Sequence, residues 1–366
     1  MITIKTDRLY WIDWLRFLAA SAVVYNHIMK DHFVEYFLLN QNSQNIIIKT
    51  LFHLSDCGHK AVIMFFSLSG ILVGGKLIEK ILKGNLIIST YFIDRFFRIY
   101  VPYIPILILS GIVSHENFNM KLLLLNILGF QPVYCDIFAT NYPLWTLGYE
   151  IWFYILAGSA ASFFATPLKK MDKLIYFLIF LVSISIYLKF ESKYLFCFFI
   201  GSCIYFLKLN KKNNTFFLIV SFIFAFGISS ASQIANRLAP AYFATSFQFD
   251  SFRDIINVFQ CGAFCVFIRT ASLYKPTKSF IIKIEKLGST LASFSYTMYL
   301  CHVPVLYFLA RINLFPSEKF DVVSPYSVYL FILKLIIVIF VSIVLYFAFE
   351  RNTLYLKNKF KLLFNL

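Results

Sequence analysis

Long apolar runs recur along the whole chain and are separated by short polar segments. A helix needs about 20 apolar residues to cross a bilayer, and ten runs reach or approach that length. The predicted spans are 11–28, 61–78, 99–114, 148–166, 174–188, 194–207, 215–232, 254–268, 288–310 and 329–349. An eleventh run, 121–134, contains Asn126, Gly129 and Pro132. The pattern predicts an all-α transmembrane helix bundle in which residues 1–366 form one membrane domain.

The basic residues favour ten spans over eleven. Cytoplasmic loops of membrane proteins carry an excess of Lys and Arg. With ten spans and a cytoplasmic N-terminus, 22 of the 34 basic residues lie on the inner side, and a crossing by 121–134 reduces that number to 13. We therefore expect cytoplasmic N- and C-termini and expect 121–134 to lie at the interface or dip into the membrane, with eleven spans as the alternative.

Composition narrows the class of protein further. Hydrophobic residues make up 60% of the chain and charged residues 14%, which excludes a soluble enzyme, a disordered chain and a nucleic-acid-binding module. The net charge of +16 then indicates basic loops that face anionic lipid. The seven cysteines include no CxxC pair, so we expect structural thiols and no metal site.

The first apolar run contains three ionisable residues, Asp13, Arg16 and His27, so it is predicted to be a retained helix and no cleaved signal peptide. Placing a charged side chain inside a membrane is energetically unfavourable, so each such residue is expected to have a functional or structural role. Arg16 and His27 are eleven residues apart, which places them about 20° apart on one helix face and roughly 16 Å apart along the axis. Asp13 precedes Arg16 by three residues and can pair with it. The alternative is an interfacial Asp–Arg anchor with a histidine at the far interface.

Two further segments carry candidate residues. Ser67, Ser69 and Gly70 permit either close helix packing or the approach of a ligand to the backbone. Arg95 and Arg98 share a helix face at the inner start of a span. Arginine side chains at such a position bind phosphates or, alternatively, anchor lipid headgroups.

Two more segments carry polar groups near the predicted outer face. Glu150 is the only carboxylate of its helix, and aromatic anchoring explains its Trp and Tyr neighbours but does not explain the glutamate. Tyr299 and His302 are three residues apart and share a face, and Pro304 disturbs the helix just beyond them. His302 is either functional or a structural histidine with a satisfied hydrogen bond.

Together these segments resemble the acyltransferase family 3 membrane proteins, bacterial enzymes that O-acetylate surface polysaccharides, Nod factors and antibiotics. The motifs that carry the resemblance are Ile12-Asp13-Trp14-Leu15-Arg16-Phe17-Leu18-Ala19…His27, Phe65-Phe66-Ser67-Leu68-Ser69-Gly70, Arg95-x-x-Arg98 with the following proline, Trp145-Thr146-Leu147-Gly148-Tyr149-Glu150, Ser295-Tyr296…Tyr299-Leu300…His302-Val303-Pro304 and Phe349-Glu350. They occur in the family's order and cover almost the whole chain. Thr146 replaces the usual Ser, and Ile63 stands where many members have Asp. The appended hydrolase-like domain of some members is not expected.

The resemblance implies an O-acyltransferase of the bacterial cytoplasmic (inner) membrane. Its donor substrate would be acyl-CoA, most simply acetyl-CoA, with no permanently bound cofactor. Its acceptor would be a hydroxyl of a cell-surface or lipid-linked polysaccharide. The rival readings are a transporter or flippase of a glycan or acylated intermediate, and a non-catalytic partner in glycan assembly.

The resemblance and the chemistry of acyl transfer together suggest roles for the candidate residues. Transfer to a hydroxyl needs a base, and His27 is the candidate, with Glu150 supporting it or binding the acceptor. The residues expected to bind acyl-CoA or other substrate groups are Asp13, which orients Arg16, and Ser69, Arg95, Arg98, Tyr299 and His302. Arg95 and Arg98 would bind the nucleotide phosphates on the cytoplasmic side, and the pantetheine arm would run inward past Ser69.

Overall fold

The computed structural model describes residues 9–39, 45–114, 118–165, 169–208, 214–238, 246–316, 318–321 and 324–364. Within these ranges every regular element is a helix, and the only extended pairing is an isolated bridge between Phe33 and Phe320. The predicted all-α class is therefore confirmed for the described part of the chain.

The helices form two compact units, each built from segments far apart in sequence. Unit 1 comprises 1–19, 62–87 and 159–292, and unit 2 comprises 20–61, 88–158 and 293–366. Three helices are divided between the units, namely α1 (Ile12–His32), α3 (Gly58–Ser69) and α7 (Trp145–Ser162), and the last residue of α12, Ser293, also belongs to unit 2.

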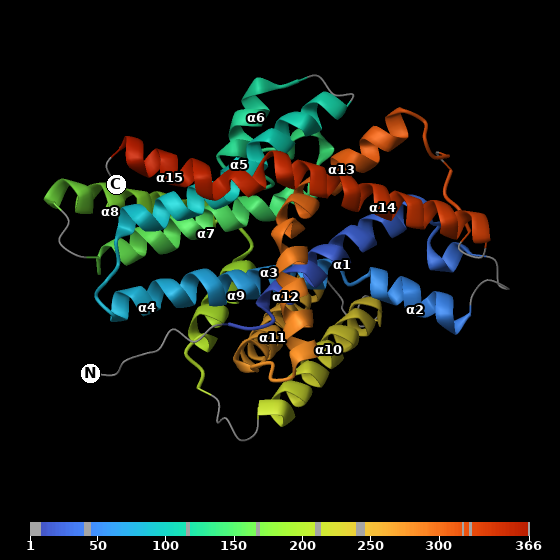
Figure 1. Cartoon of the computed structure of the whole chain (residues 1–366), viewed down its shortest axis with the longest axis horizontal. Coiled ribbons are helices and arrows are strands. Elements are labelled where there is room, and N and C mark those ends of the chain that lie inside the picture. The colour runs from blue at the N-terminus through green and yellow to red at the C-terminus, as the bar shows by residue number, and fades with distance from the viewer. Residues whose placement is uncertain are drawn as a thin grey trace. The chain divides into compact units, whose positions relative to one another are not determined.

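Unit 1 is a bundle whose middle helix is α11. Its helices are α4 (Lys76–Leu82), α8 (Lys170–Tyr187), α9 (Ser192–Ile204), α10 (Asn214–Leu238), α11 (Ser246–Leu273) and α12 (Ser279–Ser293), with a π-helical segment η3 (Gly70–Gly75) between α3 and α4. α11 packs against both α9 and α10, and α10 and α11 lie side by side in Figure 1. The π-helical segment packs along α9.

Glycines let the π-helical segment and α9 touch through their backbones. A Cβ atom on Gly70 would lie 2.6 Å from the carbonyl oxygen of Phe198, and one on Gly201 would lie 2.8 Å from that of Ser67. Both distances are shorter than real contacts of Cβ atoms. This is the close helix packing that the Ser-Leu-Ser-Gly segment predicts.

Unit 2 is organised around α13, in which 12 of 17 residues are buried. Its elements are η1 (Tyr36–Leu38), α2 (Ile46–Ser55), α5 (Ile88–Val113), α6 (Met120–Ile127), η4 (Phe138–Thr140), η5 (Tyr142–Leu144), α13 (Ser295–Arg311), α14 (Pro325–Ala348), η8 (Glu350–Asn352) and α15 (Thr353–Leu363). α13 packs against α14 and α5, and α15 lies along α5, where the ring of Phe360 meets that of Phe97 (Figure 1).

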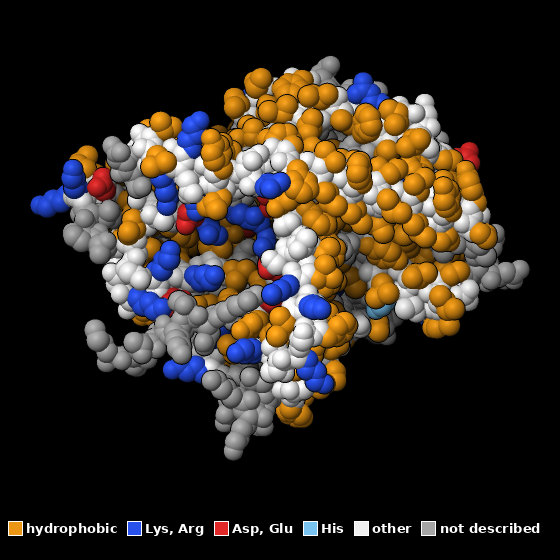
Figure 2. All heavy atoms as spheres, viewed as in Figure 1, with side chains coloured by type: hydrophobic (Ala, Val, Ile, Leu, Met, Phe, Trp, Pro, Cys, Tyr) orange, Lys and Arg blue, Asp and Glu red, His pale blue; other side chains and the backbone are white. Residues whose placement is uncertain are grey.

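α14 presents an apolar stripe on its outer surface. Tyr329, Ile332, Ile336, Phe340 and Phe347 are all exposed and recur at helical spacing. Hydrophobic side chains cover the corresponding surface in Figure 2. An exposed stripe of this kind is typical of a helix face that contacts lipid.

Length and composition mark five described helical stretches as able to cross a membrane. They are Ile46–Leu82, Ile88–Val113, Thr215–Ile234, Gln248–Leu273 and Pro325–Leu363. A shorter apolar helix, Ser192–Ile204, lies at another predicted span. The number and length of these apolar helices indicate a multi-pass membrane protein.

Two of the predicted segments do not form a single long helix in the structure. The run 288–310 is wrong as a single helix, because α12 ends at Ser293 and α13 begins at Ser295 after a non-helical Phe294. The run 121–134 overlaps the eight-residue helix α6, which begins at Met120 and is followed by turns. At 1.5 Å per residue α6 is about 12 Å long, too short to cross the roughly 30 Å hydrocarbon core.

Candidate active site

A proline explains how the segment before α7 is tied to α13. Pro304 lies inside α13 and has no N–H, so the carbonyl of Leu300 has no i+4 donor in its own helix. Asn141 replaces the missing donor, since its Nδ2 lies 3.0 Å from the oxygen of Leu300. The same Nδ2 donates to Oγ of Ser110 on α5 at 3.1 Å. One buried amide thus connects α5, α13 and the chain that enters α7.

The residues beside Asn141 are held in an unusual backbone conformation. Ala139 and Thr140 have φ values of 53° and 50°, the left-handed region that residues with a Cβ rarely adopt. Tyr299 holds the other end of this segment by donating to the carbonyl of Pro143 at 2.7 Å, and the hydroxyl of Thr146 lies 2.7 Å from that of Tyr299. Strained backbone that is fixed by its surroundings is common at functional sites.

His27 and His302 form a hydrogen-bonded, stacked pair. Nδ1 of His27 lies 2.7 Å from Nε2 of His302, and the ring centroids are 4.9 Å apart with planes 19° from parallel. His302 is fully buried, whereas His27 is half-buried. The structure thus brings together two predicted site residues that are 275 positions apart in the sequence.

The hydrogen-bond network assigns the protons of this pair. Nδ1 of His302 lies 3.2 Å from the carbonyl oxygen of Met298, and because a carbonyl can only accept, this nitrogen is the donor. In the neutral ring Nε2 of His302 then carries a lone pair and accepts the proton on Nδ1 of His27. Nε2 of His27 is consequently left as a lone pair. His302 therefore sets the tautomer that lets His27 take up a proton.

Tyr142 lies at the edge of the histidine pair. Its ring meets that of His27 edge-on, with centroids 4.9 Å apart, yet 45% of the residue is exposed. Partial burial, together with the nearby Tyr307 and Asp31, raises the pKa of Tyr142 to about 12. The phenol therefore stays neutral near pH 7 and can donate a hydrogen bond next to His27.

A buried carboxylate organises the start of α13. Glu350, which follows α14, accepts hydrogen bonds from the backbone N–H of Thr297 at 3.1 Å and from its hydroxyl at 2.6 Å. Its second oxygen pairs with the guanidinium of Arg98 at 2.7 Å. An anion at a helix N-terminus is favourable, so Glu350 fixes the end of the helix that holds His302. Five residues separate Thr297 from His302, a rise of about 7–8 Å.

Arg95 has different surroundings from Arg98. Its guanidinium lies over the ring of Tyr154, 5.6 Å from the centroid, and its Nε is buried without a hydrogen-bond partner among the described residues. The hydroxyl of Tyr154 donates in turn a hydrogen bond to Glu150. The structure therefore groups Glu150 with the arginines. The side chain of His27, by contrast, is hydrogen-bonded to His302.

The remaining candidates belong to unit 1. Asp13 and Arg16 form the predicted ion pair, with 3.7 Å between the carboxylate and the guanidinium. The indole N–H of Trp14 donates to the carbonyl of Ile284 on α12 at 2.7 Å and fixes this end of α1. Ser69 is the last residue of α3, half-buried, directly before the π-helical segment. Arg16 and His27 lie on the one continuous helix α1, as their spacing predicts.

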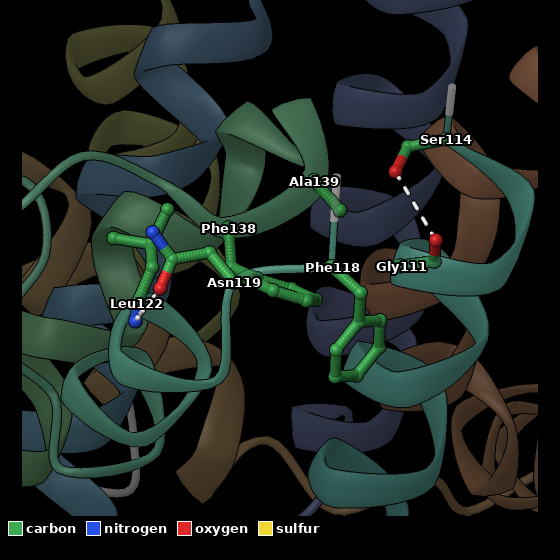
Figure 3. A pocket seen from close by; sticks show the side chains of 7 residues that line it. All are labelled: Gly111, Ser114, Phe118, Asn119, Leu122, Phe138 and Ala139. Carbon is green, nitrogen blue, oxygen red and sulfur yellow. Dashed lines mark hydrogen bonds between the residues drawn. The ribbon is translucent and has the colours of Figure 1, made fainter. Parts of the chain in front are cut away.

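A small hollow lies at the C-terminal end of α5, where Ala139 also lines it. Gly111, Ser114, Phe118, Leu122 and Phe138 line most of it (Figure 3). The rings of Phe118 and Phe138 meet edge-on at 5.4 Å, and Asn119 caps α6 beside them. Its volume of about 10 Å³ holds roughly one water molecule. It is a packing hollow of the α5–α6 corner.

Sequence reasoning did not single out several residues that complete the site. Asn141, Tyr142, Tyr154 and Thr297 carry no motif of their own that indicates a role. Glu350 gave a usable signal, because a carboxylate that directly ends a long apolar helix needs a partner. Its partners Arg98 and Thr297 lie far away in sequence.

Comparison with known families agrees with this arrangement. The family model described as an acyltransferase domain, Acyl_transf_3, matches residues 9–351. The chain belongs to this acyltransferase family. The matched range contains every candidate described above, from Asp13 to Glu350. Searches of curated proteins and of solved structures returned no match to the chain. As a member of the Acyl_transf_3 family with apolar membrane helices, the protein is a membrane acyltransferase.

Proposed function

We propose that the protein is an O-acyltransferase of the bacterial cytoplasmic membrane that transfers an acetyl group from cytosolic acetyl-CoA to a hydroxyl of a cell-surface or lipid-linked polysaccharide. The observation that carries the proposal is the hydrogen-bonded pair of His27 and His302. The family supplies the reaction class, and the pair supplies a base of suitable chemistry.

In the proposed reaction His27 removes the proton of the acceptor hydroxyl. Nε2 of His27 accepts this proton as the hydroxyl oxygen attacks the thioester carbonyl. The resulting tetrahedral intermediate expels the sulfur of coenzyme A, which takes the proton back from His27, and the products are an O-acetyl ester and free coenzyme A. Nε2 of His302 stabilises the transient imidazolium through its bond to Nδ1 of His27, as the orienting group of a catalytic triad does.

The donor is proposed to bind at the arginines. Arg95 and the exposed part of Arg98 would contact the nucleotide phosphates, while Glu150 and Tyr154 hold the position of the Arg95 side chain. Ser69 is proposed to line the path of the pantetheine arm, and the Asp13–Arg16 pair to bind an anionic part of the donor. Tyr299 supports the site by fixing the segment that carries Tyr142.

The proposed topology has ten spans and cytoplasmic termini. It places Arg95 and Arg98 at the inner face, where acetyl-CoA is available, and the end of α1 at the outer face. His27 then lies toward the outer half of the membrane, so a donor that enters from the cytosol meets an acceptor that enters from outside. The excess of basic residues on the inner side supports this orientation.

The test uses the full chain, purified and reconstituted in nanodiscs with [¹⁴C]acetyl-CoA and the deacetylated surface glycan of the source strain. We expect release of coenzyme A to match the formation of labelled ester on the glycan. Wild-type protein that binds the glycan and forms no ester would contradict the proposal and favour transport. NMR comparison of surface glycans from wild-type and deletion strains would identify the ester that is lost.

A further inference from the structure

Two buried amide side chains of α11 have unpaired polar atoms. Asn257 is 2% exposed, and neither its Nδ2 nor its Oδ1 has a hydrogen-bond partner among the described residues. Gln260 is fully buried, and its Oε1 is likewise unpaired within the described part of the chain. Both residues lie in the stretch Gln248–Leu273, which is long and apolar enough to cross a membrane. Unpaired amides are energetically unfavourable in such surroundings, so they indicate that a polar group binds there.

The two amides lie among the packed helices of unit 1. Nε2 of Gln260 donates to Oγ of Ser229 on α10 at 3.0 Å, so this side chain lies at the contact of α10 and α11. Cys261 is directed toward α3 instead, where its Sγ lies 3.2 Å from Oγ of Ser67. Because an α-helix turns about 100° per residue, Asn257 lies between Gln260 and Cys261 around the helix. It therefore occupies the face of α11 between α10 and α3.

Ser67 connects this part of α11 with the proposed path of the acyl donor. Ser67 and Ser69 are in the last turn of α3, and Ser69 is proposed to line the path of the pantetheine arm. Cys261, which contacts Ser67, follows Asn257 by four residues, or about 6 Å along the helix axis. The unpaired amides are therefore about one helical turn from the Ser67 contact, in the unit that also contains Ser69.

The chemistry of these side chains favours an uncharged ligand that both donates and accepts hydrogen bonds. Asn257 offers an N–H donor and a carbonyl acceptor, and Gln260 offers an additional acceptor. The pantetheine arm of acyl-CoA contains two uncharged amides, each with one N–H and one carbonyl. By ordinary bond lengths these amides are about 5 Å apart in an extended arm, and Asn257 and Gln260 differ by about 4.5 Å along the helix axis.

We propose that Asn257 and Gln260 bind the amide groups of the pantetheine arm of the acyl donor. This inference rests on the proposed function and identifies the residues that recognise the arm. The ligand amides complete hydrogen bonds that the protein alone leaves unmade, so donor binding removes an unfavourable feature of the empty bundle. Recognition of this kind places no charge in the apolar interior.

The test compares thioesters with and without an amide. Full-length protein in nanodiscs receives acetyl-CoA, S-acetyl-N-acetylcysteamine, which has one amide, or S-pentyl thioacetate, an apolar analogue with none. Pantetheine binding is measured on the same samples by saturation-transfer difference NMR. Asn257→Leu and Gln260→Met remove the amides at similar side-chain volume. Thr270→Val is the matched control, because Thr270 is a buried polar residue of the same helix whose hydroxyl lies 2.8 Å from that of Ser221.

We expect Asn257→Leu and Gln260→Met to weaken pantetheine binding about five- to tenfold, as the loss of one or two hydrogen bonds does. Transfer from S-acetyl-N-acetylcysteamine should fall by a similar factor, and transfer from S-pentyl thioacetate should stay at the wild-type rate. Thr270→Val should bind pantetheine as wild type does. Asn257→Leu should not lower the melting temperature of the donor-free protein, because it removes unpaired groups.

Pantetheine binding that is unchanged in both amide variants, or absent in wild type, would overturn the site. Equal loss of transfer from the two small thioesters would overturn it as well, because the amides would then bind water or support packing. Pantetheine binding that depends on Asn257, without acetyl transfer by wild type from any donor, would instead contradict the proposed function.

Discussion

Asn141 and Pro304 are coupled through a single carbonyl oxygen. Because Pro304 leaves the carbonyl of Leu300 without a helical donor, Asn141 supplies that donor from another part of the chain. An unpaired buried carbonyl costs about 1–3 kcal/mol. We therefore expect Asn141→Ala to lower the free energy of unfolding by about that amount, measured by thermal unfolding in detergent.

A double-mutant cycle provides the control for this prediction. Pro304→Ala restores an N–H that can reach the carbonyl of Leu300, so Asn141→Ala should cost less in that background. Equal costs in both backgrounds would show that Asn141 contributes through Ser110 alone.

Single residues also show what the sequence could predict about the site. The spacing of Tyr299 and His302 correctly placed them on one face, and the ion pair of Asp13 and Arg16 was correct because both partners lie on one helix turn. Asn141 could not be predicted, since its partner Leu300 is 159 residues away and no local periodicity relates the two.

The contact between η3 and α9 depends on the absence of side chains. A Cβ on Gly70 or Gly201 would press on backbone atoms, which cannot move aside as a flexible side chain can. We expect Gly70→Ala and Gly201→Ala each to destabilise the protein by about 1–3 kcal/mol, as overpacking does.

Gly227 of α10 is the matched control for the glycine variants, because a Cβ there would meet no atom within 4 Å. Gly227→Ala should leave stability unchanged or raise it by up to about 1 kcal/mol, since alanine favours helix. The measurement is the melting temperature of each of the three variants. Similar melting temperatures for all three would contradict the close packing of η3 against α9.

The two arginines of α5 should respond differently to substitution. Arg98→Ala leaves the buried carboxylate of Glu350 without its cation. Removing one partner of a fully buried ion pair lowers the free energy of unfolding by about 3–5 kcal/mol. The loss is smaller here because Arg98 is partly exposed. Arg95→Ala breaks no ion pair with Glu350. We expect Arg98→Ala to lower the melting temperature, and Arg95→Ala to raise the KM for acetyl-CoA with little change in stability.

Charge reversal provides the control for the arginine variants. The double variant Arg98→Glu with Glu350→Arg should recover part of the stability that either single change loses. Equal loss of stability from Arg95→Ala and Arg98→Ala would contradict the separate roles.

Helix boundaries were harder to predict than helix positions. Apolar runs located most helices, but α5 begins at Ile88, eleven residues before the predicted span, because its first turns are polar on one side. The break at Phe294 was missed for another reason. Neither glycine nor proline marks it, and the apolar run continues across it from α12 into α13.

At the scale of the whole molecule, the number of membrane crossings stays a prediction. Five described stretches have the length and hydropathy of spans, whereas α1 and α7 are shorter or carry polar groups. On α1 those polar groups include His27, Asp13 and Arg16, so a helix that carries the proposed base is not among the stretches that hydropathy recognises.

The ten-span topology can be tested directly. We expect a reporter fused after Lys212 to lie in the cytoplasm, because the loop at this position carries an excess of lysines. Alkaline phosphatase activity with no green fluorescence from the matched fusion would contradict the model, because it would place this loop outside and require an odd number of crossings before it.

The central claim is that His27 is the base of an acyl transfer and that His302 orients it. The most direct measurement is the rate of acetyl transfer by reconstituted His27→Ala protein, with acetyl-CoA binding measured on the same sample. We predict a rate at least about 10²-fold below wild type, as for loss of a general base, with donor binding retained. A near-normal rate from correctly inserted His27→Ala protein would contradict the account.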